Sequence, residues 1–166
     1  MWREKRAYGR LKGIKGVPTL YRTINGLALV LEAIPGKNIE SKETVAKLSD
    51  GFFEELRVLV ENIHKRGLAH CDLKRAPNIL LGDDGRPYIV DWAASISKSE
   101  FRFFPLYHLY EKFIQDDLNA IIKIRLKHFP NSVNPEEINQ YNQRSPAEKV
   151  VRAIKEKAKD LLKKIA

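Results

Sequence analysis

Two short apolar runs separated by a polar turn constrain the middle of the chain more than any other feature. Residues 79–81 and 88–90 flank the sequence Asp-Asp-Gly-Arg at 83–86, which is typical of a tight turn. This pattern predicts two antiparallel strands joined in a hairpin. Asn78 comes directly before the first strand and Asp91 directly after the second. The hairpin should therefore bring two oxygen donors level with each other at its open end.

Oxygen donors arranged in this way suit Mg²⁺, which completes its coordination shell with water and phosphate oxygens. Asp72 lies one loop before the hairpin and is placed to orient or deprotonate a hydroxyl nucleophile. Lys74 is placed to neutralise charge on a phosphoryl group in transfer. The residues alone thus indicate a phosphoryl-transfer site, with a purely structural role for Asp72, Asn78 and Asp91 as the alternative.

Helical periodicity and turn signals predict the elements around this hairpin. Asn25-Gly26 is a dipeptide favoured in two-residue hairpin turns. Ser145-Pro-Ala-Glu148 is a capping box with proline at the first helical position. The other predicted elements are a basic helix at 3–11, strands at 19–24 and 27–31, and helices at 50–66, at 106–129, from 134 onward and at 145–166. This order predicts an α+β fold with segregated strands.

Length, charge and cysteine content narrow the class of protein. The 166 residues suit one domain, and the 30 Lys and Arg against 21 Asp and Glu give a net charge of +9. Such a balance favours an anionic partner: nucleotide, nucleic acid, phosphorylated glycan or acidic lipid. Cys71 is the only cysteine, which excludes a disulfide framework and a multi-cysteine zinc site. No apolar run approaches the ~17–25 residues of a membrane span, and no secretory signal is evident, so we expect a cytoplasmic location.

The central stretch resembles the protein-kinase-like superfamily. His70-Cys-Asp-Leu-Lys74 followed by Asn78-Ile-Leu80 matches the catalytic-loop pattern H-x-D-L-K then N-I-L, and Asp91-Trp-Ala93 stands where the family carries D-F-G. Residues 29–36 resemble the strand and hinge that hold adenine, and 3–18 resemble the C-helix and its exit. The resemblance implies one kinase-like domain over 1–166. Its partial N-lobe and hinge, with one helix and a β-hairpin, would span 1–34, and a mainly helical C-lobe would span 35–166.

Four residues would carry the chemistry that this resemblance implies. Asp72 would be the catalytic carboxylate that orients the acceptor hydroxyl, and Lys74 would lie beside the γ-phosphate. Asn78 and Asp91 would hold Mg²⁺. ATP and Mg²⁺ are therefore the cofactors that the resemblance implies.

Four further residues would bind or position the nucleotide. The resemblance places the Glu32 carbonyl and the Ile34 amide against adenine, with Leu80 as the floor of its pocket. Glu4 would be the helix acid that normally pairs with the lysine of the third N-lobe strand.

The sequence also departs from the usual protein-kinase pattern. Asn78 follows Asp72 by one residue more than usual, Cys71 replaces the common arginine, and the segment after Asp91 is too short for a peptide-docking platform. These compact features resemble the bacterial lipopolysaccharide-kinase and RIO-like branches. The glycine-rich loop and the third-strand lysine have no counterpart in the 166 residues, and we expect their absence to impair catalysis.

The sequence therefore predicts an ATP- and Mg²⁺-dependent phosphotransferase acting on a hydroxyl acceptor. That acceptor would be a sugar or lipid-linked glycan, as in lipopolysaccharide, or a protein Ser/Thr. Two alternatives stay open: a pseudokinase or scaffold without activity, and a basic anion-binding module. No nucleic-acid motif is evident. The basic helix at 145–166 is expected either to pack on the domain or to contact the inner membrane surface peripherally.

Three neighbouring positions have simpler expected roles. His70 and Trp92 should be buried packing residues, and Cys71 should fill space in the loop and not act as a nucleophile. Either Asp116 or Asp117 is expected to anchor the loop that carries Asp72, with a solvated acidic turn as the alternative.

Overall fold

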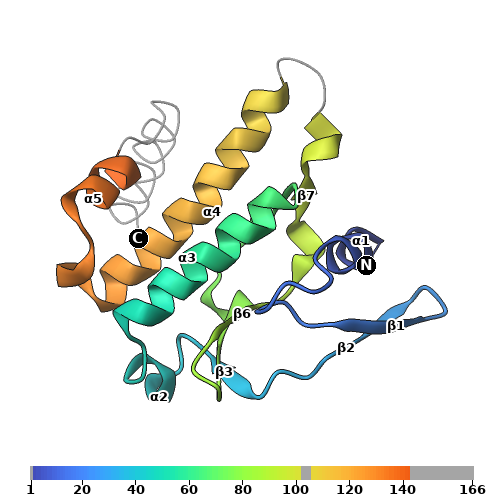
Figure 1. Cartoon of the computed structure of the whole chain (residues 1–166), viewed down its shortest axis with the longest axis horizontal. Helices are drawn as coiled ribbons and strands as arrows, with labels where there is room; N and C mark the ends of the chain where they lie inside the picture. Colours follow the sequence, from blue (N-terminus) through green and yellow to red (C-terminus); the bar gives the residue numbers. More distant parts are fainter. Residues whose placement is uncertain (1, 102–105, 143–166) are drawn as a thin grey trace, which may run out of the picture.

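The computed structural model describes residues 2–101 and 106–142, which form a helical layer with three small sheets beside it (Figure 1). Helices α3 (Asp50–Lys65) and α4 (Leu106–His128) lie side by side, and α5 (Pro135–Asn142) packs on α4. The short α2 (Lys42–Val45) precedes α3. The predicted helix at 145–166 falls outside the described residues. Of the described helices, none combines the length and apolar character needed to cross a membrane.

Helix α3 follows directly from its sequence. The Ser49 hydroxyl accepts a hydrogen bond from the Phe52 amide at 3.3 Å and caps the first turn, while Gly67 ends the helix with a φ of +73°. The buried apolar side chains recur at helical spacing: Phe52, Phe53, Leu56, Leu59, Val60 and Ile63. They pack into the single core cluster of the described residues, together with Ile79, Ile89 and Trp92, which have no exposed surface.

The predicted hairpin around Asn25-Gly26 is confirmed. Strands β1 (Leu20–Ile24) and β2 (Ala28–Leu31) pair antiparallel, and both turn residues have positive φ, +48° and +68°, as a two-residue turn of this hand requires. The hairpin extends away from the helical layer (Figure 1). It leaves Tyr21 and Leu27 exposed, by 64% and 82%.

The predicted strands of the central hairpin also form, in a three-stranded sheet. Its order is β3 (Gly36–Asn38), β5 (Ile79–Gly82), β6 (Pro87–Ile89), and all neighbours are antiparallel. A separate two-stranded pair joins β4 (Leu68–Ala69) to β7 (Ile96–Ser97). Short 3₁₀ turns lie between these elements: η1 (Ala76–Asn78), η2 (Trp92–Ala94), η3 (Lys98–Phe101) and, after α4, η4 (Pro130–Ser132).

Helix α1 (Trp2–Arg10) is attached to the segment that follows β6. Arg3 forms an ion pair with Glu100 at 3.0 Å, and Arg10 donates hydrogen bonds to the Ser97 hydroxyl and to the Gly67 carbonyl. These side chains hold residues 91–100 against the first helix of the chain. The position of α1 is therefore coupled to the segment that begins at Asp91.

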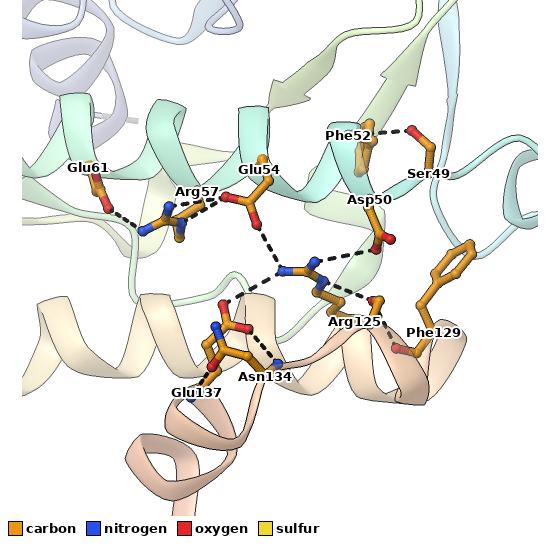
Figure 2. Close-up of polar contacts among 11 residues, drawn as sticks. Ser49, Asp50, Phe52, Glu54, Arg57, Glu61, Arg125, Phe129, Asn134 and Glu137 are labelled. Atoms are coloured by element: carbon orange, nitrogen blue, oxygen red, sulfur yellow. Dashed lines mark hydrogen bonds and ion pairs between the residues drawn. The ribbon is translucent and has the colours of Figure 1, made fainter.

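A buried arginine joins helices α3, α4 and α5. The Arg125 side chain, only 10% exposed, leaves α4 and contacts Glu54 and Asp50 of α3 at 3.0 and 3.3 Å, and Glu137 of α5 at 3.6 Å (Figure 2). The helix start predicted at 134 is confirmed, because Asn134 and Glu137 accept hydrogen bonds from each other's amides. One guanidinium thus fixes α3, α4 and α5 relative to one another.

Candidate active site

The loop at residues 70–78 is anchored from below by Asp117 of α4. This carboxylate is 2% exposed and accepts hydrogen bonds from the His70 amide at 2.7 Å and the Cys71 amide at 2.9 Å. Of the two acidic residues that the sequence left open, Asp117 is the anchor. It holds Cys71 in a left-handed conformation with a φ of +68°, which a non-glycine residue adopts only when its surroundings enforce it.

His70 links the loop to the end of β6. Its Nε2 donates to the Val90 carbonyl at 3.0 Å, and its Nδ1 accepts from the Asp72 amide at 3.3 Å, so the hydrogen bonds assign the neutral tautomer. Burial lowers the pKa of His70, which keeps the ring neutral despite the carboxylates around it. The ring packs edge-on against buried Trp92 at 4.7 Å, which confirms the packing role predicted for both residues.

Asp72 and Asn78 lie in direct contact. The Asn78 side-chain amide donates to the Asp72 carbonyl at 3.1 Å and to its carboxylate at 3.3 Å. Asp72 stays 29% exposed and forms an ion pair with Arg75 at 3.6 Å. Arg75 is not among the residues predicted from the sequence, although its position three residues after Asp72 is a signal that could have identified it. Lys74, in contrast, is exposed and has no ion pair with the residues that the structure describes.

Asp91 lies one residue beyond the position that we predicted. Ile79 pairs with Ile89, and the Val90 amide donates to the Asn78 carbonyl at 3.0 Å, so Val90 and not Asp91 is level with Asn78. Asp91 then turns out of the strand with a φ of +63°, and its carboxylate accepts from the Ala93 amide at 3.4 Å. The left-handed turn leaves Asp91 exposed at the open end of the hairpin, next to Asn78 in the ladder.

Asn78 and Asp91 are the residues at this end that could hold a magnesium ion, with the rest of its shell supplied by a substrate and water. Because the Asn78 amide nitrogen is used by Asp72, its Oδ1 is left as an acceptor with no hydrogen bond from any described residue. The described residues contain no group of three His, Cys, Asp or Glu side chains suited to a metal. Asn78 and Asp91 alone would make a weak site, but Mg²⁺ commonly takes one or two protein oxygens and fills the rest with phosphate and water.

Two residues of α1 approach Asp91. The Tyr8 hydroxyl lies close to the Asp91 backbone, and Tyr8 is itself 3% exposed. Burial raises the pKa of Glu4, and the negative charge of Asp91 adds to the rise. Glu4 forms no ion pair with another described residue. No sequence signal marks Tyr8, because a tyrosine at helical spacing is typical of an ordinary core residue.

The three residues predicted to contact adenine lie on two adjoining segments. Strand β3 follows Ile34 and pairs Asn38 with Leu80 of β5, which brings the hinge segment beside the predicted adenine floor. The Glu32 carboxylate accepts from the Thr19 amide at 2.9 Å. The Glu32 carbonyl and the Ile34 amide have no hydrogen-bond partner among the described residues and are available to a ligand.

Comparison with known proteins links part of the chain to serine/threonine protein kinases. A segment covering 45% of the chain is 42% identical over 81 residues to the serine/threonine-protein kinase PknD of Chlamydia muridarum. It is 41% identical over 81 residues to PknD of Chlamydia trachomatis serovar L2b, and 36% identical over 78 residues to PknD of Chlamydia pneumoniae. The matched segment spans only 8–9% of the length of these relatives. No family model matches the chain.

Proposed function

We propose that this chain carries the catalytic part of an ATP- and magnesium-dependent phosphotransferase with a hydroxyl acceptor. The observation that carries the proposal is the cluster of Asp72, Asn78 and Asp91 around neutral His70, on a loop anchored by Asp117. Strained backbone at Cys71 and Asp91 is typical of residues that are held for chemistry. The similarity to serine/threonine protein kinases supports the same reaction class.

We infer that the fold corresponds to a kinase-like C-lobe at residues 35–166 joined to part of an N-lobe at 1–34. The order of elements supports this inference: a helix and a hairpin precede the hinge, and a long helix precedes the loop at 70–78. The contacts of α1 with residues 91–100 support it as well, because a C-helix controls the segment that follows the metal-binding aspartate.

In the proposed reaction, the Asp72 carboxylate accepts a hydrogen bond from the acceptor hydroxyl and directs its oxygen at the γ-phosphorus. The new oxygen–phosphorus bond forms while the bond to the β–γ bridging oxygen breaks, and the hydroxyl proton passes to Asp72. Lys74 is exposed and would neutralise charge on the transferring group. Asn78 and Asp91 would hold Mg²⁺, which shields the triphosphate charge when bound.

A protein serine or threonine is the acceptor that we propose first, because the relatives are described as serine/threonine-protein kinases. A sugar or lipid-linked glycan hydroxyl is the second candidate, since Asp72 and Lys74 recognise only the hydroxyl and the phosphoryl group. Competition between a serine-rich peptide and a monosaccharide for phosphate transfer would distinguish the two acceptors.

One observation favours an inactive, nucleotide-binding pseudokinase as the alternative. Glu4 lies near Asp91, yet no lysine or arginine of the described residues pairs with it. A phosphate-gripping lysine paired to this acid is part of the catalytic arrangement in protein kinases. The alternative therefore predicts Mg²⁺-dependent ATP binding without transfer.

The test measures ADP formation from Mg-ATP, with a serine-rich peptide and a monosaccharide as acceptors, by the purified full chain. Asp91→Asn and Asp72→Asn should each lower turnover by on the order of 10²–10³-fold. Asp83→Asn, an exposed turn residue outside the cluster, is the matched control and should retain full activity. Magnesium-dependent ATP binding by calorimetry, lost in Asp91→Asn but without turnover in the parent protein, would favour the pseudokinase. No binding and no turnover would refute both proposals.

A further inference from the structure

A cavity of about 750 Å³ lies on a different part of the molecule from Asp72, Asn78 and Asp91, none of which lines it. Its walls come from three segments distant in the sequence: residues 11–20 after α1, the face of α3 from Glu54 to Asn62, and the beginning of β6. The volume falls within the range of sites for small molecules, about 300–1,000 Å³. Glu32, whose carbonyl is predicted to contact adenine, also lines this cavity, but the proposed phosphoryl transfer itself makes no use of it.

The wall formed by residues 11–20 is held rigidly in place. The Ile14 amide donates to the Leu11 carbonyl at 3.0 Å, and the Ile89 amide of β6 donates to the Gly16 carbonyl at 2.8 Å. Gly16 has a φ of +93°, and a Cβ there would lie 2.6 Å from Leu59 and 2.8 Å from the Pro87 carbonyl. Because the loop is bonded to the sheet and pressed against α3, the cavity is formed before any ligand arrives.

The floor of the cavity is aliphatic. Its apolar lining consists mainly of branched side chains from residues 11–20 and from α3: Leu11, Ile14, Val17, Leu20, Val58 and Leu59. Val58 is 50% exposed on α3, so an apolar side chain faces open space where a ligand would cover it. An alkyl group gains most from such a surface, because each methylene removed from water contributes about 0.8 kcal/mol in general.

The rim of the cavity carries more free positive than negative charge. Lys12, Lys15 and Arg86 line it and form no ion pair within residues 2–101 and 106–142. Glu54, also in the lining, is neutralised by Arg57 at 3.1 Å and by Arg125 at 3.0 Å (Figure 2).

Two other carboxylates, Glu32 and Glu55, also line the cavity, so within the described residues three unpaired cations stand against two unpaired carboxylates and the excess is one positive charge. Glu32 is already engaged by the Thr19 amide, a hydrogen bond that lowers the pKa of Glu32. Glu55 is exposed and can turn toward solvent. A lining with this positive excess and a mainly aliphatic floor is complementary to a molecule with an anionic head and an apolar tail.

We propose that this cavity binds a free single-chain anionic amphiphile. Its alkyl chain would lie along Val58 and Leu59, and its carboxylate, sulfate or phosphate head would meet Lys12, Lys15 and Arg86. The apolar lining is mainly aliphatic, with Tyr8 and Tyr88 as its aromatic members, so an alkyl chain matches it more closely than a nucleobase. The proposal does not depend on phosphotransferase activity, so the two can fail separately.

Calorimetric titration of the full chain with decanoate, below its micelle-forming concentration, tests the proposal. Decanoate should bind with one-to-one stoichiometry, and more tightly than decan-1-ol or decyltrimethylammonium, which have the same chain with a neutral or cationic head. Equal affinity for the three probes would show that the charge of the head group does not contribute to binding. A stoichiometry above one would show adsorption to exposed apolar surface. Either result overturns the proposal.

Two pairs of variants locate the binding. Val58→Trp fills the cavity from a half-exposed position and should abolish decanoate binding, whereas Leu109→Trp, at an exposed position of α4 outside the cavity, should leave it unchanged. Lys12→Gln with Lys15→Gln should weaken binding roughly three- to thirty-fold, as expected for two exposed ion pairs. Lys65→Gln, outside the cavity, should have no effect. All five positions are exposed, so folding should survive, and unchanged binding in Val58→Trp would refute the site.

Discussion

Asp117→Asn tests how the loop at residues 70–78 is held. The carboxylate is almost completely buried and receives the amides of His70 at 2.7 Å and Cys71 at 2.9 Å on its two oxygens. His64 approaches the first of these oxygens at 3.1 Å. Asparagine is nearly isosteric but has a single acceptor oxygen. Its amino group must therefore face one of the backbone N–H donors, and a donor would oppose a donor in a buried place.

The expected cost follows from these contacts. A hydrogen bond to a charged group contributes about 1.5–3 kcal/mol and a neutral one about 0.5–1.5 kcal/mol. The substitution removes one charge-assisted bond and weakens the other to a neutral one, so the free energy of unfolding should fall by about 2–4 kcal/mol. Relief from burying a carboxylate acts in the opposite direction. It is the smaller effect here, because donors already surround both oxygens.

Urea unfolding followed by circular dichroism gives the free energy directly. Asp116→Asn is the matched control, since it makes the same chemical change at the neighbouring and more exposed residue of α4. This control should cost less than about 0.5 kcal/mol. If the two variants unfold at the same urea concentration, Asp117 does not anchor the loop and the reasoning is wrong. A large loss in Asp117→Asn, with the control intact, would support it.

Three further predictions concern Arg125, His70 and Cys71. Arg125→Ala should lower the free energy of unfolding by about 2 kcal/mol in the same urea assay, because three carboxylates on two other helices lose their shared donor. Lys127→Ala removes an exposed ion pair and should cost far less. Burial lowers the pKa of His70 in the folded chain, so the unfolded chain binds more protons. The midpoint of thermal unfolding should therefore fall as the pH drops below about 6.5, and it should fall less steeply in a His70→Asn variant. Burial and, to a smaller extent, the charges of nearby carboxylates raise the pKa of Cys71 to about 12. At pH 8 its thiol should therefore react with iodoacetamide far more slowly than free glutathione does, and an equal rate would contradict the burial of this side chain.

Local sequence signals predicted those elements whose stability is itself local. The Asn25-Gly26 turn and the capped, periodic helix at 50–66 depend mainly on neighbouring residues, and the predicted bounds of both agree with the structure within a residue or two. Strands β3, β4 and β7 were missed. They are two or three residues long and form only by pairing with a strand distant in the sequence, so neither hydrophobic periodicity nor strand propensity predicts them. The offset of Asp91 by one position has a local origin, because the register of the hairpin is fixed by the length and type of its turn, which here takes up residues 82–86 between the pair Leu81 and Pro87.

The candidate site divides in the same way. Asp72, Asn78 and Asp91 stand in a recognisable pattern along one stretch of chain, and the structure brings them to one end of one hairpin. What holds them there is remote in sequence. Asp117 lies 46 or 47 residues from the amides that it accepts, and its neighbour Asp116 was an equal candidate on sequence grounds.

The remote contacts carry a consequence for how the proposed site would respond to perturbation. Asp91 is fixed on one side by its own hairpin and on the other by α1, through the hydroxyl of Tyr8 and through Arg3 and Arg10 on the segment behind it. Tyr8 also lines the cavity beneath the end of α1. A ligand that shifts α1 by a fraction of an ångström would therefore move Asp91. Asp72 would stay in place, because its loop is anchored separately by Asp117. Metal binding should accordingly be more sensitive to the surroundings of α1 than orientation of the acceptor hydroxyl, because the two carboxylates are supported by different helices.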